Sequence, residues 1–272
     1  MAVLALHDLS CYSKSSITVV LPVMEALGVE TAVIPTAILS TQTDGFDDIY
    51  SEDREREMLL IYSRLKALGI SFDGVYSGYL SSESEIDAIS SILSSESGLK
   101  LVDPVMGDGG ELYQTITRQH AERMAKLVRK ADVITPNFTE AMILSGLEDG
   151  MRKVGQQEIH DLVSVLRAMG PEMGVITSVP LIAGGLGNIA WKGKEIRMFQ
   201  YDDLGVSYPG SGDLFASVLF ALLVRGESFF GSVSHATGIA TYAIAYSKEH
   251  GRERRLGIEL KPVMDEIRRR AL

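Results

Sequence analysis

Cysteine and basic residues are scarce in this sequence, and each scarcity excludes a class of protein. The 272 residues include one cysteine, Cys11, which excludes an internal disulfide framework and a Cys-rich zinc site. Lysine and arginine together number 26 against 36 acidic residues, so the formal net charge is −10. Because nucleic-acid affinity comes from clustered basic side chains, we expect no nucleic-acid partner.

Long apolar runs and a basic leader are also missing. No apolar run approaches the roughly 18 residues that span a bilayer, so we expect no membrane partner. The opening apolar run, residues 2–6, has no basic lead and is soon interrupted by His7 and Asp8, which is unlike a signal peptide. With 46% hydrophobic and 23% charged residues, the composition is that of an ordinary globular protein. We therefore expect a cytoplasmic enzyme or binding protein.

Short apolar runs alternate with segments of helical period through the first two thirds of the chain. The expected strands cover residues 3–6, 31–35, 74–77, 100–102, 132–135 and 173–177. The expected helices between them cover residues 15–27, 53–68, 83–93, 117–130, 139–144 and 156–169. This order predicts an α/β fold in three layers, with a mostly parallel central sheet between helices.

The pattern changes after Thr177. Residues 188–199 predict an antiparallel hairpin around Gly193, and three further helices are expected over 213–224, 229–248 and 261–270. No stretch rich in Pro, Gly or Ser divides the chain. We therefore expect a single domain, residues 1–272.

Two glycine-rich strings are candidates for a phosphate-binding loop, and the context of the first one excludes it. Residues 185–190 match the dinucleotide fingerprint as a string, but strand-like residues follow them instead of a helix. No Walker A loop is present, because the only Gly-Lys pair, Gly193-Lys194, is followed by Glu195. An NAD-dependent oxidoreductase is therefore not favoured.

The second string, Gly210-Ser211-Gly212-Asp213, runs directly into an apolar helix. Its two glycines let backbone N–H groups approach an anion without obstruction from a Cβ atom. Asp213 then has two interpretations. It is either a first-turn residue that stabilises the helix by about 1 kcal/mol or a base beside an anion hole, and spacing alone leaves both open.

Polar side chains also follow two of the predicted strands. Asp103 and Asp108 lie just after the strand at 100–102, and Asn137 and Glu140 follow the strand at 132–135. Because ligands of open α/β sheets bind at the carboxyl ends of the strands, these side chains are expected to converge. Oxygen ligands of this kind suit Mg²⁺ together with substrate phosphates.

Three strings, Asp103-Pro-Val-Met-Gly-Asp108, Thr135-Pro-Asn137-Phe-Thr-Glu140 and Gly210-Ser-Gly-Asp213, occur in this order along the chain. Together they resemble the signature of the ribokinase superfamily, specifically its vitamin kinase branch, and most closely that of pyridoxal/pyridoxamine kinases. The resemblance spans nearly the whole chain, from His7 to about Tyr246. It implies a ribokinase-like α/β/α fold and a likeness to ATP-dependent kinases of small molecules.

The resemblance also implies the parts of a phosphoryl-transfer site. Asp213 would be the base that deprotonates a substrate hydroxymethyl group. The anion hole for the transferring phosphoryl group would be formed by Gly210, Ser211 and Gly212. The ATP phosphates would contact Asn137 and Ser178. Such a division of labour suits phosphoryl transfer, which needs alignment and charge neutralisation more than covalent chemistry.

Metal and substrate residues are implied in the same way. Mg²⁺ would be organised by Asp108 and Glu140, largely through water. A monovalent cation, K⁺ or Na⁺, would be held by Asp103, Thr135 and Thr177. The pyridine ring of a B6 vitamer would be contacted by Ser10, Thr43 and Tyr79. The resemblance further implies a homodimer.

Three candidate functions remain open. No Arg or Lys occurs in the vitamin-facing segments 7–13, 36–46 and 76–82, which favours the unphosphorylated B6 vitamer, phosphorylated at its 5-hydroxymethyl oxygen, as substrate. The nearest alternative is a hydroxymethylpyrimidine or hydroxymethylpyrimidine-phosphate kinase of the same fold. An alternative of another class is a non-catalytic vitamin-binding protein on a kinase scaffold, which the intact motif carboxylates disfavour.

Overall fold

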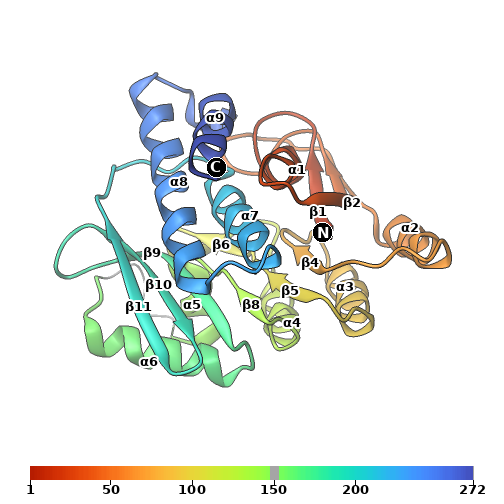
Figure 1. Cartoon of the computed structure of the whole chain (residues 1–272), viewed down its shortest axis with the longest axis horizontal. Coiled ribbons are helices and arrows are strands. Elements are labelled where there is room, and N and C mark those ends of the chain that lie inside the picture. The colour runs from red at the N-terminus through yellow and green to blue at the C-terminus, as the bar shows by residue number, and fades with distance from the viewer. Residues whose placement is uncertain (148–152, 272) are drawn as a thin grey trace.

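A twisted nine-stranded sheet forms the middle layer of the structure, a computed structural model that describes residues 1–147 and 153–271 (Figure 1). Its strand order is β11-β10-β9-β8-β5-β4-β1-β2-β3. The bounds are β1 Ala2–Ser10, β2 Glu30–Leu39, β3 Ser51–Asp53, β4 Gly74–Ser77, β5 Leu99–Val102, β8 Val133–Ile134, β9 Met173–Pro180, β10 Leu186–Lys192 and β11 Glu195–Tyr201. The six strands from β9 to β2 are parallel, whereas at the two edges the pairings of β9 with β10, β10 with β11 and β2 with β3 are antiparallel. A separate two-stranded hairpin pairs β6 (Gly107–Asp108) with β7 (Glu111–Leu112).

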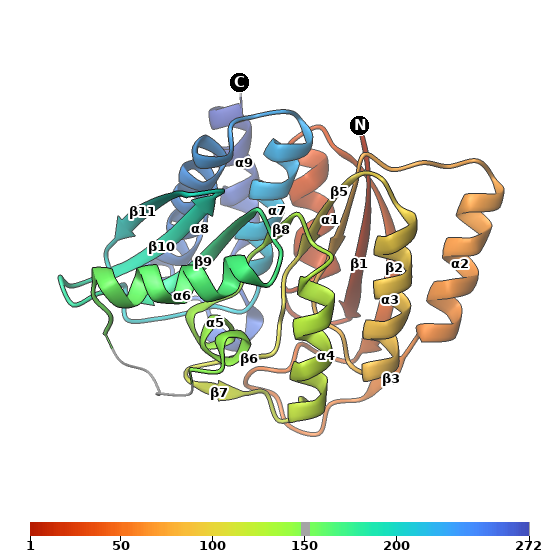
Figure 2. The ribbon, with the colours of Figure 1, turned by 90° about the horizontal axis from the view of Figure 1, so that it is seen from below.

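Helices cover both faces of the sheet (Figure 2). One face carries α2 (Glu55–Ala67), α3 (Glu83–Ser95), α4 (Arg118–Val128), α5 (Phe138–Ser145) and α6 (Gln156–Ala168). The other face carries α1 (Ile17–Ala26), α7 (Ser211–Val224), α8 (Phe229–Glu249) and α9 (Leu260–Ala271), and a short 3₁₀ turn covers Arg254–Leu256. The predicted three-layer α/β fold is therefore confirmed.

Burial on both faces explains why the central strands read as continuous apolar runs. In β1, Leu4 and Leu6 point into the core beneath α2 to α6, whereas Val3 and Ala5 point into the core beneath α1 and α7 to α9. Successive side chains of a strand alternate between faces, so a strand between two helical layers must be apolar throughout. Helix α7 is buried along its whole length from residue 214 to 222, which fixes the position of its N-terminus.

Three short strands were not predicted, and β1, β2 and β9 extend several residues beyond their expected ends. The strands β3, β6 and β7 have only two or three residues and mostly polar sequences, so no periodicity marks them. Strand β1 continues to Ser10 because Leu9 and Ser10 pair with Ile38 and Leu39 beyond a bulge. The predicted hairpin at 188–199 is confirmed as β10 and β11. In the part of the chain that the structure describes, no helix is long and apolar enough to cross a membrane.

Candidate active site

A cavity of about 620 Å³ opens where the parallel strands end. Its lining includes every residue that the sequence singled out for a site: Ser10, Thr43, Tyr79, Asp103, Asp108, Thr135, Asn137, Glu140, Thr177, Ser178, Gly210, Ser211, Gly212 and Asp213. The predicted convergence of Asp103, Asp108, Asn137 and Glu140 is therefore confirmed, and Asp213 lines the same cavity. It follows from topology, because parallel strands in one sheet share their carboxyl edge.

The glycine-rich turn before α7 has a backbone shape that only glycine suits. Gly210 has φ 82°, and a Cβ atom there would lie 2.4 Å from the carbonyl oxygen of Lys14. The turn bends the chain so that the N-terminus of the buried helix faces the cavity, where its first N–H groups lack helical partners. The N–H of Ser211 already donates to the carbonyl of Tyr208 at 3.2 Å. A phosphoryl oxygen would have to replace that bond at Ser211.

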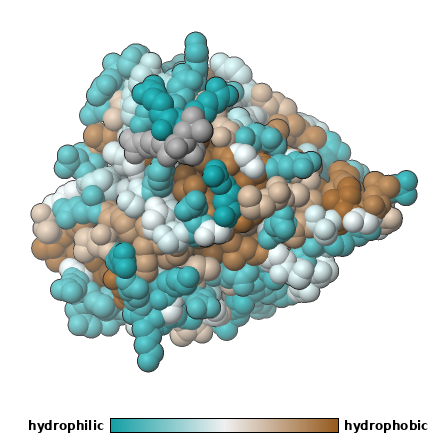
Figure 3. Space-filling model, in the orientation of Figure 1, coloured by the Kyte–Doolittle hydropathy of each residue, from teal (hydrophilic) through white to brown (hydrophobic). Residues whose placement is uncertain are grey.

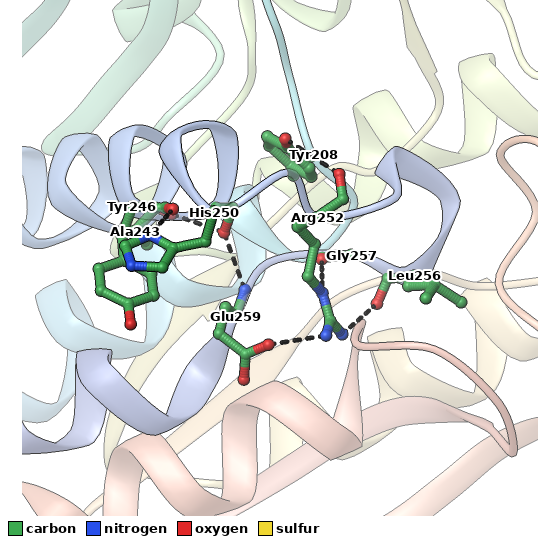
Figure 4. A network of polar contacts seen from close by, with 9 residues as sticks. Tyr208, Ala243, Tyr246, His250, Arg252, Leu256, Gly257 and Glu259 are labelled. Carbon is green, nitrogen blue, oxygen red and sulfur yellow. Dashed lines mark hydrogen bonds and ion pairs between the residues drawn. The ribbon is translucent and has the colours of Figure 1, made fainter.

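A network behind the turn holds it in place (Figure 4). The guanidinium of Arg252 binds three partners: the carbonyl of Gly257 at 2.9 Å, the carbonyl of Leu256 at 3.1 Å and the carboxylate of Glu259 at 2.7 Å. The hydroxyl of Tyr208 donates to the carbonyl of Arg252 at 3.3 Å. Tyr208 is the residue two before Gly210, so this basic segment braces the candidate anion hole.

Asp213 stands in the first turn of α7 with its carboxylate at the cavity. Its Oδ2 atom accepts a hydrogen bond from the backbone N–H of Ser16 at 2.8 Å. Burial raises the pKa of Asp213 to about 6, against a lowering by the Ser16 N–H and a further raising by the charge of Asp8. A carboxylate with this pKa is mostly ionised at neutral pH and can accept a hydroxyl proton.

Asp8 and Ser16, which the sequence did not single out, form a buried cluster beside Asp213. The Asp8 carboxylate is 2% exposed and accepts hydrogen bonds from the hydroxyls of Ser10, at 2.8 Å, and of Ser16. Ser16 has φ 48° and ψ −129°, a conformation that costs an L-residue about 1–3 kcal/mol. No sequence pattern could have shown this cluster, because Asp8 and Ser16 meet Asp213 only through the fold.

Three further carboxylates, those of Asp103, Asp108 and Glu140, lie in the segments that follow β5 and β8. The Glu140 carboxylate accepts from the backbone N–H groups of Met106, at 3.0 Å, and Asn137, at 2.8 Å. Burial and the charge of Asp103 raise the pKa of Glu140, and burial with the charge of Asp213 raises that of Asp103. Asp108 is exposed to the cavity on the β6–β7 hairpin. A cation between these groups would relieve their mutual repulsion.

The two residues matched to ATP phosphates have different surroundings. The Asn137 side chain caps α5, because its Oδ1 atom accepts from the N–H of Glu140 at 2.9 Å and its Nδ2 atom donates to Gly107 at 2.8 Å. Asn137 therefore ties the β6–β7 hairpin to α5 whatever else it binds. Ser178 is exposed with φ 58°, and its hydroxyl lies 3.2 Å from that of Tyr201.

The opposite end of the cavity carries the residues matched to a vitamin. The hydroxyl of Ser10 donates to the Asp8 carboxylate, whereas Thr43 lies on the loop after β2 and lines the cavity. Tyr79 is 8% exposed, and its hydroxyl lies 3.2 Å from that of Thr115. This end therefore combines an aromatic ring with neutral hydroxyl groups.

The lining of the whole cavity is rich in acidic residues. Among the described residues that line it, eight are acidic and none is Lys, Arg or His; the acidic residues are Asp8, Asp44, Asp103, Asp108, Glu140, Asp202, Asp203 and Asp213. Arg254 lies at the mouth, where it pairs with Asp44 at 2.6 Å. A polyphosphate can enter such a cavity only together with cations.

The carboxylates of Asp108 and Glu140 fit an Mg²⁺ ion that binds together with a nucleotide. Asp108 and Glu140 offer carboxylate oxygens at one cavity, and each interacts with the other's charge. In residues 1–147 and 153–271 no cluster of three or more His, Cys, Asp or Glu side chains is arranged to hold a metal by itself. Mg²⁺ commonly uses one or two carboxylates and completes its shell with water and phosphate.

Comparison with known proteins identifies the family. Residues 17–256 match the family described as phosphomethylpyrimidine kinase. A Bacteroides thetaiotaomicron protein, provisionally named a phosphomethylpyrimidine kinase, is 32% identical, with a TM-score of 0.91 over 98% of this chain and 93% of that one. Another crystal form of that protein contains pyridoxal.

Curated relatives carry two different names. The chain is 31% identical over 157 residues to the pyridoxal kinase of Arabidopsis thaliana, which covers 53% of this chain and 48% of that protein. It is 29% identical over 168 residues to the hydroxymethylpyrimidine/phosphomethylpyrimidine kinase of Staphylococcus aureus, covering 57% and 55%. The aligned part is thus about half of the length of each of these two relatives. The match over residues 17–256 and the close structural agreement show that the chain belongs to the phosphomethylpyrimidine kinase family, whose members are ATP-dependent small-molecule kinases with a ribokinase-like fold.

Proposed function

We propose that this protein phosphorylates the 5-hydroxymethyl group of an unphosphorylated B6 vitamer at the expense of ATP. The observation that carries the proposal is the composition of the cavity, which joins an aromatic, neutral end at Tyr79 to a glycine-rich helix start at Gly210. Relatives named pyridoxal kinase and a relative crystallised with pyridoxal support the same substrate.

Asp213 is the base in this proposal. Its carboxylate takes the proton of the hydroxymethyl oxygen as that oxygen attacks the γ-phosphorus of ATP and the bond to ADP breaks. The N–H groups of Gly210, Ser211 and Gly212 hold the developing charge of the transferring phosphoryl group. Asn137 and Ser178 contact the remaining phosphates. The pKa of about 6 leaves most of Asp213 ionised at neutral pH.

Cations complete the charge balance of the acidic cavity. Asp108 and Glu140 would hold Mg²⁺, which neutralises and aligns the phosphates when bound. Asp103, Thr135 and Thr177 would hold a monovalent cation, K⁺ or Na⁺. The Thr135 hydroxyl is buried and lowers the pKa of the neighbouring Asp103 carboxylate, so the two oxygens are close enough to share a cation.

The substrate end favours a ring without a phosphate. Tyr79 offers its ring to a flat aromatic ligand, and stacking adds roughly 0.5–1.5 kcal/mol beyond burial. The hydroxyl proton of Ser10 is donated to Asp8, so its oxygen can accept from a protonated ring nitrogen, and Thr43 offers a hydroxyl for the phenolic oxygen. A second phosphate would meet carboxylates and no side-chain cation within the described lining.

A substrate comparison tests the proposal. With ATP and Mg²⁺, we expect at least one of pyridoxal, pyridoxamine and pyridoxine to show about tenfold higher kcat/KM than hydroxymethylpyrimidine, and hydroxymethylpyrimidine phosphate to react most slowly. A higher kcat/KM for hydroxymethylpyrimidine would assign the protein to the pyrimidine branch. A lack of ADP release with every substrate would instead favour a vitamin-binding protein.

We also propose a homodimer that forms through α2, the helix that stands out at one end of the sheet (Figure 1). Its outer surface exposes two apolar side chains, Leu60 at 59% and Ile61 at 40%. Figure 3, in the same orientation as Figure 1, shows a hydrophobic area at the end of the molecule where α2 lies. Glu57 and Arg64 flank this pair at equal spacing. An antiparallel pairing of two copies would therefore set Glu57 of one copy against Arg64 of the other.

Charge reversal tests this interface. Glu57→Arg or Arg64→Glu should lower the mass measured by light scattering from dimer to monomer, because like charges then face each other. The double variant should restore the dimer. A dimer that persists in both single variants, or a wild-type monomer, would reject the interface.

A further inference from the structure

The β1–α1 turn and the start of α7 meet at the candidate base, although they lie far apart in the sequence. The N–H of Ser16 reaches the Oδ2 atom of Asp213 across 197 residues of chain. That contact gives the carboxylate a hydrogen-bond donor from the β1–α1 turn. The direction of the Ser16 N–H therefore decides how the Asp213 carboxylate is oriented.

The backbone conformation that points the Ser16 N–H at Asp213 is unfavourable for a serine. Its φ of 48° with ψ −129° is a conformation that favours glycine, and a serine adopts it only where other contacts compel it. The hydroxyl of the same residue supplies that contact, because it donates to the Oδ1 atom of Asp8. One residue thus binds two carboxylates, with its side chain on Asp8 and its backbone on Asp213.

Asp8 is a firm anchor. It lies on β1, which pairs with β4 on one side and β2 on the other, and is 2% exposed. Its second carboxylate oxygen accepts from Ser10 at 2.8 Å, so both oxygens have hydroxyl partners. The Ser16 turn is also held from outside, since the N–H of Lys14 donates to Leu256 at 3.2 Å.

We propose that Ser16, anchored by Asp8, is a positioning residue that fixes the carboxylate of Asp213 for proton transfer. This proposal rests on the proposed role of Asp213 as base. Neither Asp8 nor Ser16 needs to touch the substrate in this role. The anchor aims one carboxylate oxygen at Ser16 and so leaves the other oxygen free to face the hydroxyl that reacts.

The pKa of Asp213 distinguishes a positioning role of Ser16 from a merely structural one, because a structural role would leave this pKa unchanged. The groups that interact with the Asp213 charge are Asp8, Asp103 and Tyr76. The Ser16 N–H stabilises the ionised form and lowers the pKa. Ser16→Ala removes the hydroxyl anchor and frees the N–H to turn away, so the pKa of Asp213 should rise above its wild-type value.

The experiment combines NMR with kinetics. Aspartate labelled with ¹³C at the carboxyl carbon is titrated in wild type and in Ser16→Ala, and Asp213→Asn identifies the signal. Ser16→Ala should raise this pKa, lower kcat by about 10- to 100-fold and change the KM for ATP by less than about twofold. The acid limb of the kcat profile should move to higher pH, because a base with a higher pKa is protonated over a wider range.

Two comparison variants separate the possible explanations. Ser10→Ala removes the other hydroxyl from Asp8 and should leave the pKa of Asp213 unchanged. Ser232→Ala, at a buried serine of α8 that bonds within its own helix, controls for the loss of a buried hydroxyl.

The outcomes are distinct for the two proposals. An unchanged pKa of Asp213 in Ser16→Ala, or a rise in the KM for the vitamer without a fall in kcat, would overturn the positioning role. A raised pKa with an unchanged kcat would uphold the positioning of Asp213 and reject Asp213 as the base.

Discussion

Replacing Asp213 by asparagine should make the protein more stable and much less active. Asparagine keeps an oxygen that can accept from the Ser16 N–H, but it removes the charge. A pKa raised from 3.8 to about 6 corresponds to roughly 3 kcal/mol by which the fold disfavours the ionised carboxylate. The variant should therefore gain up to about 3 kcal/mol at pH 7.5, or roughly 6–10 °C in Tm.

The pH dependence of this gain has a definite sign. The folded state holds the Asp213 proton more tightly than the unfolded state, so wild-type stability from this group is present below pH 3.8 and is lost as pH rises through about 6. The advantage of Asp213→Asn should consequently shrink to about half at pH 5 and vanish below pH 3.8. The substitution Asp213→Asn should also lower kcat by roughly 10²–10⁴-fold, as expected for loss of a general base.

Urea unfolding at pH 5 and 7.5, together with an ADP-release assay, measures both effects. Asp161→Asn, at an exposed carboxylate on α6, is the matched control and should change neither quantity appreciably. A helix-stabilising Asp213 would behave in the opposite way, because its loss costs about 0.5–1 kcal/mol and leaves turnover intact. That result would refute the assignment of Asp213 as a buried base.

Three further outcomes follow from the site geometry. Glu140→Gln should raise the Mg²⁺ concentration needed for half-maximal rate, and an unchanged Mg²⁺ titration would remove Glu140 from the metal site. Gly210→Ala should lower both Tm and kcat, because the new Cβ atom would lie 2.4 Å from the Lys14 carbonyl oxygen. A Cβ atom at Gly212 would have open space, so Gly212→Ala should lower Tm less. Equal losses of Tm in the two variants would contradict this reasoning. In wild type, kcat should fall about tenfold between pH 7.5 and pH 5, because Asp213, with a pKa of about 6, is mostly protonated at pH 5. A kcat that stays constant over this range, measured with a pH-independent coupling system, would contradict the assignment of Asp213 as the base.

The spacing of apolar residues in the sequence was enough to predict most of the helices and strands of the fold. Residues such as Val3 to Leu6 must face a core on both sides, and a run with that property is visible in sequence without any structure. The same holds for the buried helix that follows Gly210. Elements without periodicity, such as β3 and the β6–β7 hairpin, were missed because their pairing is decided by turns and neighbours.

The residues of the site could be named from sequence where each follows a strand or opens a helix, as Asp103, Glu140 and Asp213 do. Their convergence needed only the rule that parallel strands end at one edge. Their electrostatics could not be predicted, because pKa values depend on burial and on charges brought close by folding. The acidic lining, the Arg252 network behind the turn and the Asp8–Ser16–Asp213 arrangement are decided by the tertiary structure alone. Asp8, Ser16 and Asp213 are separated by up to 205 positions in the sequence, and hydrogen-bond partners at that separation leave no local pattern to read.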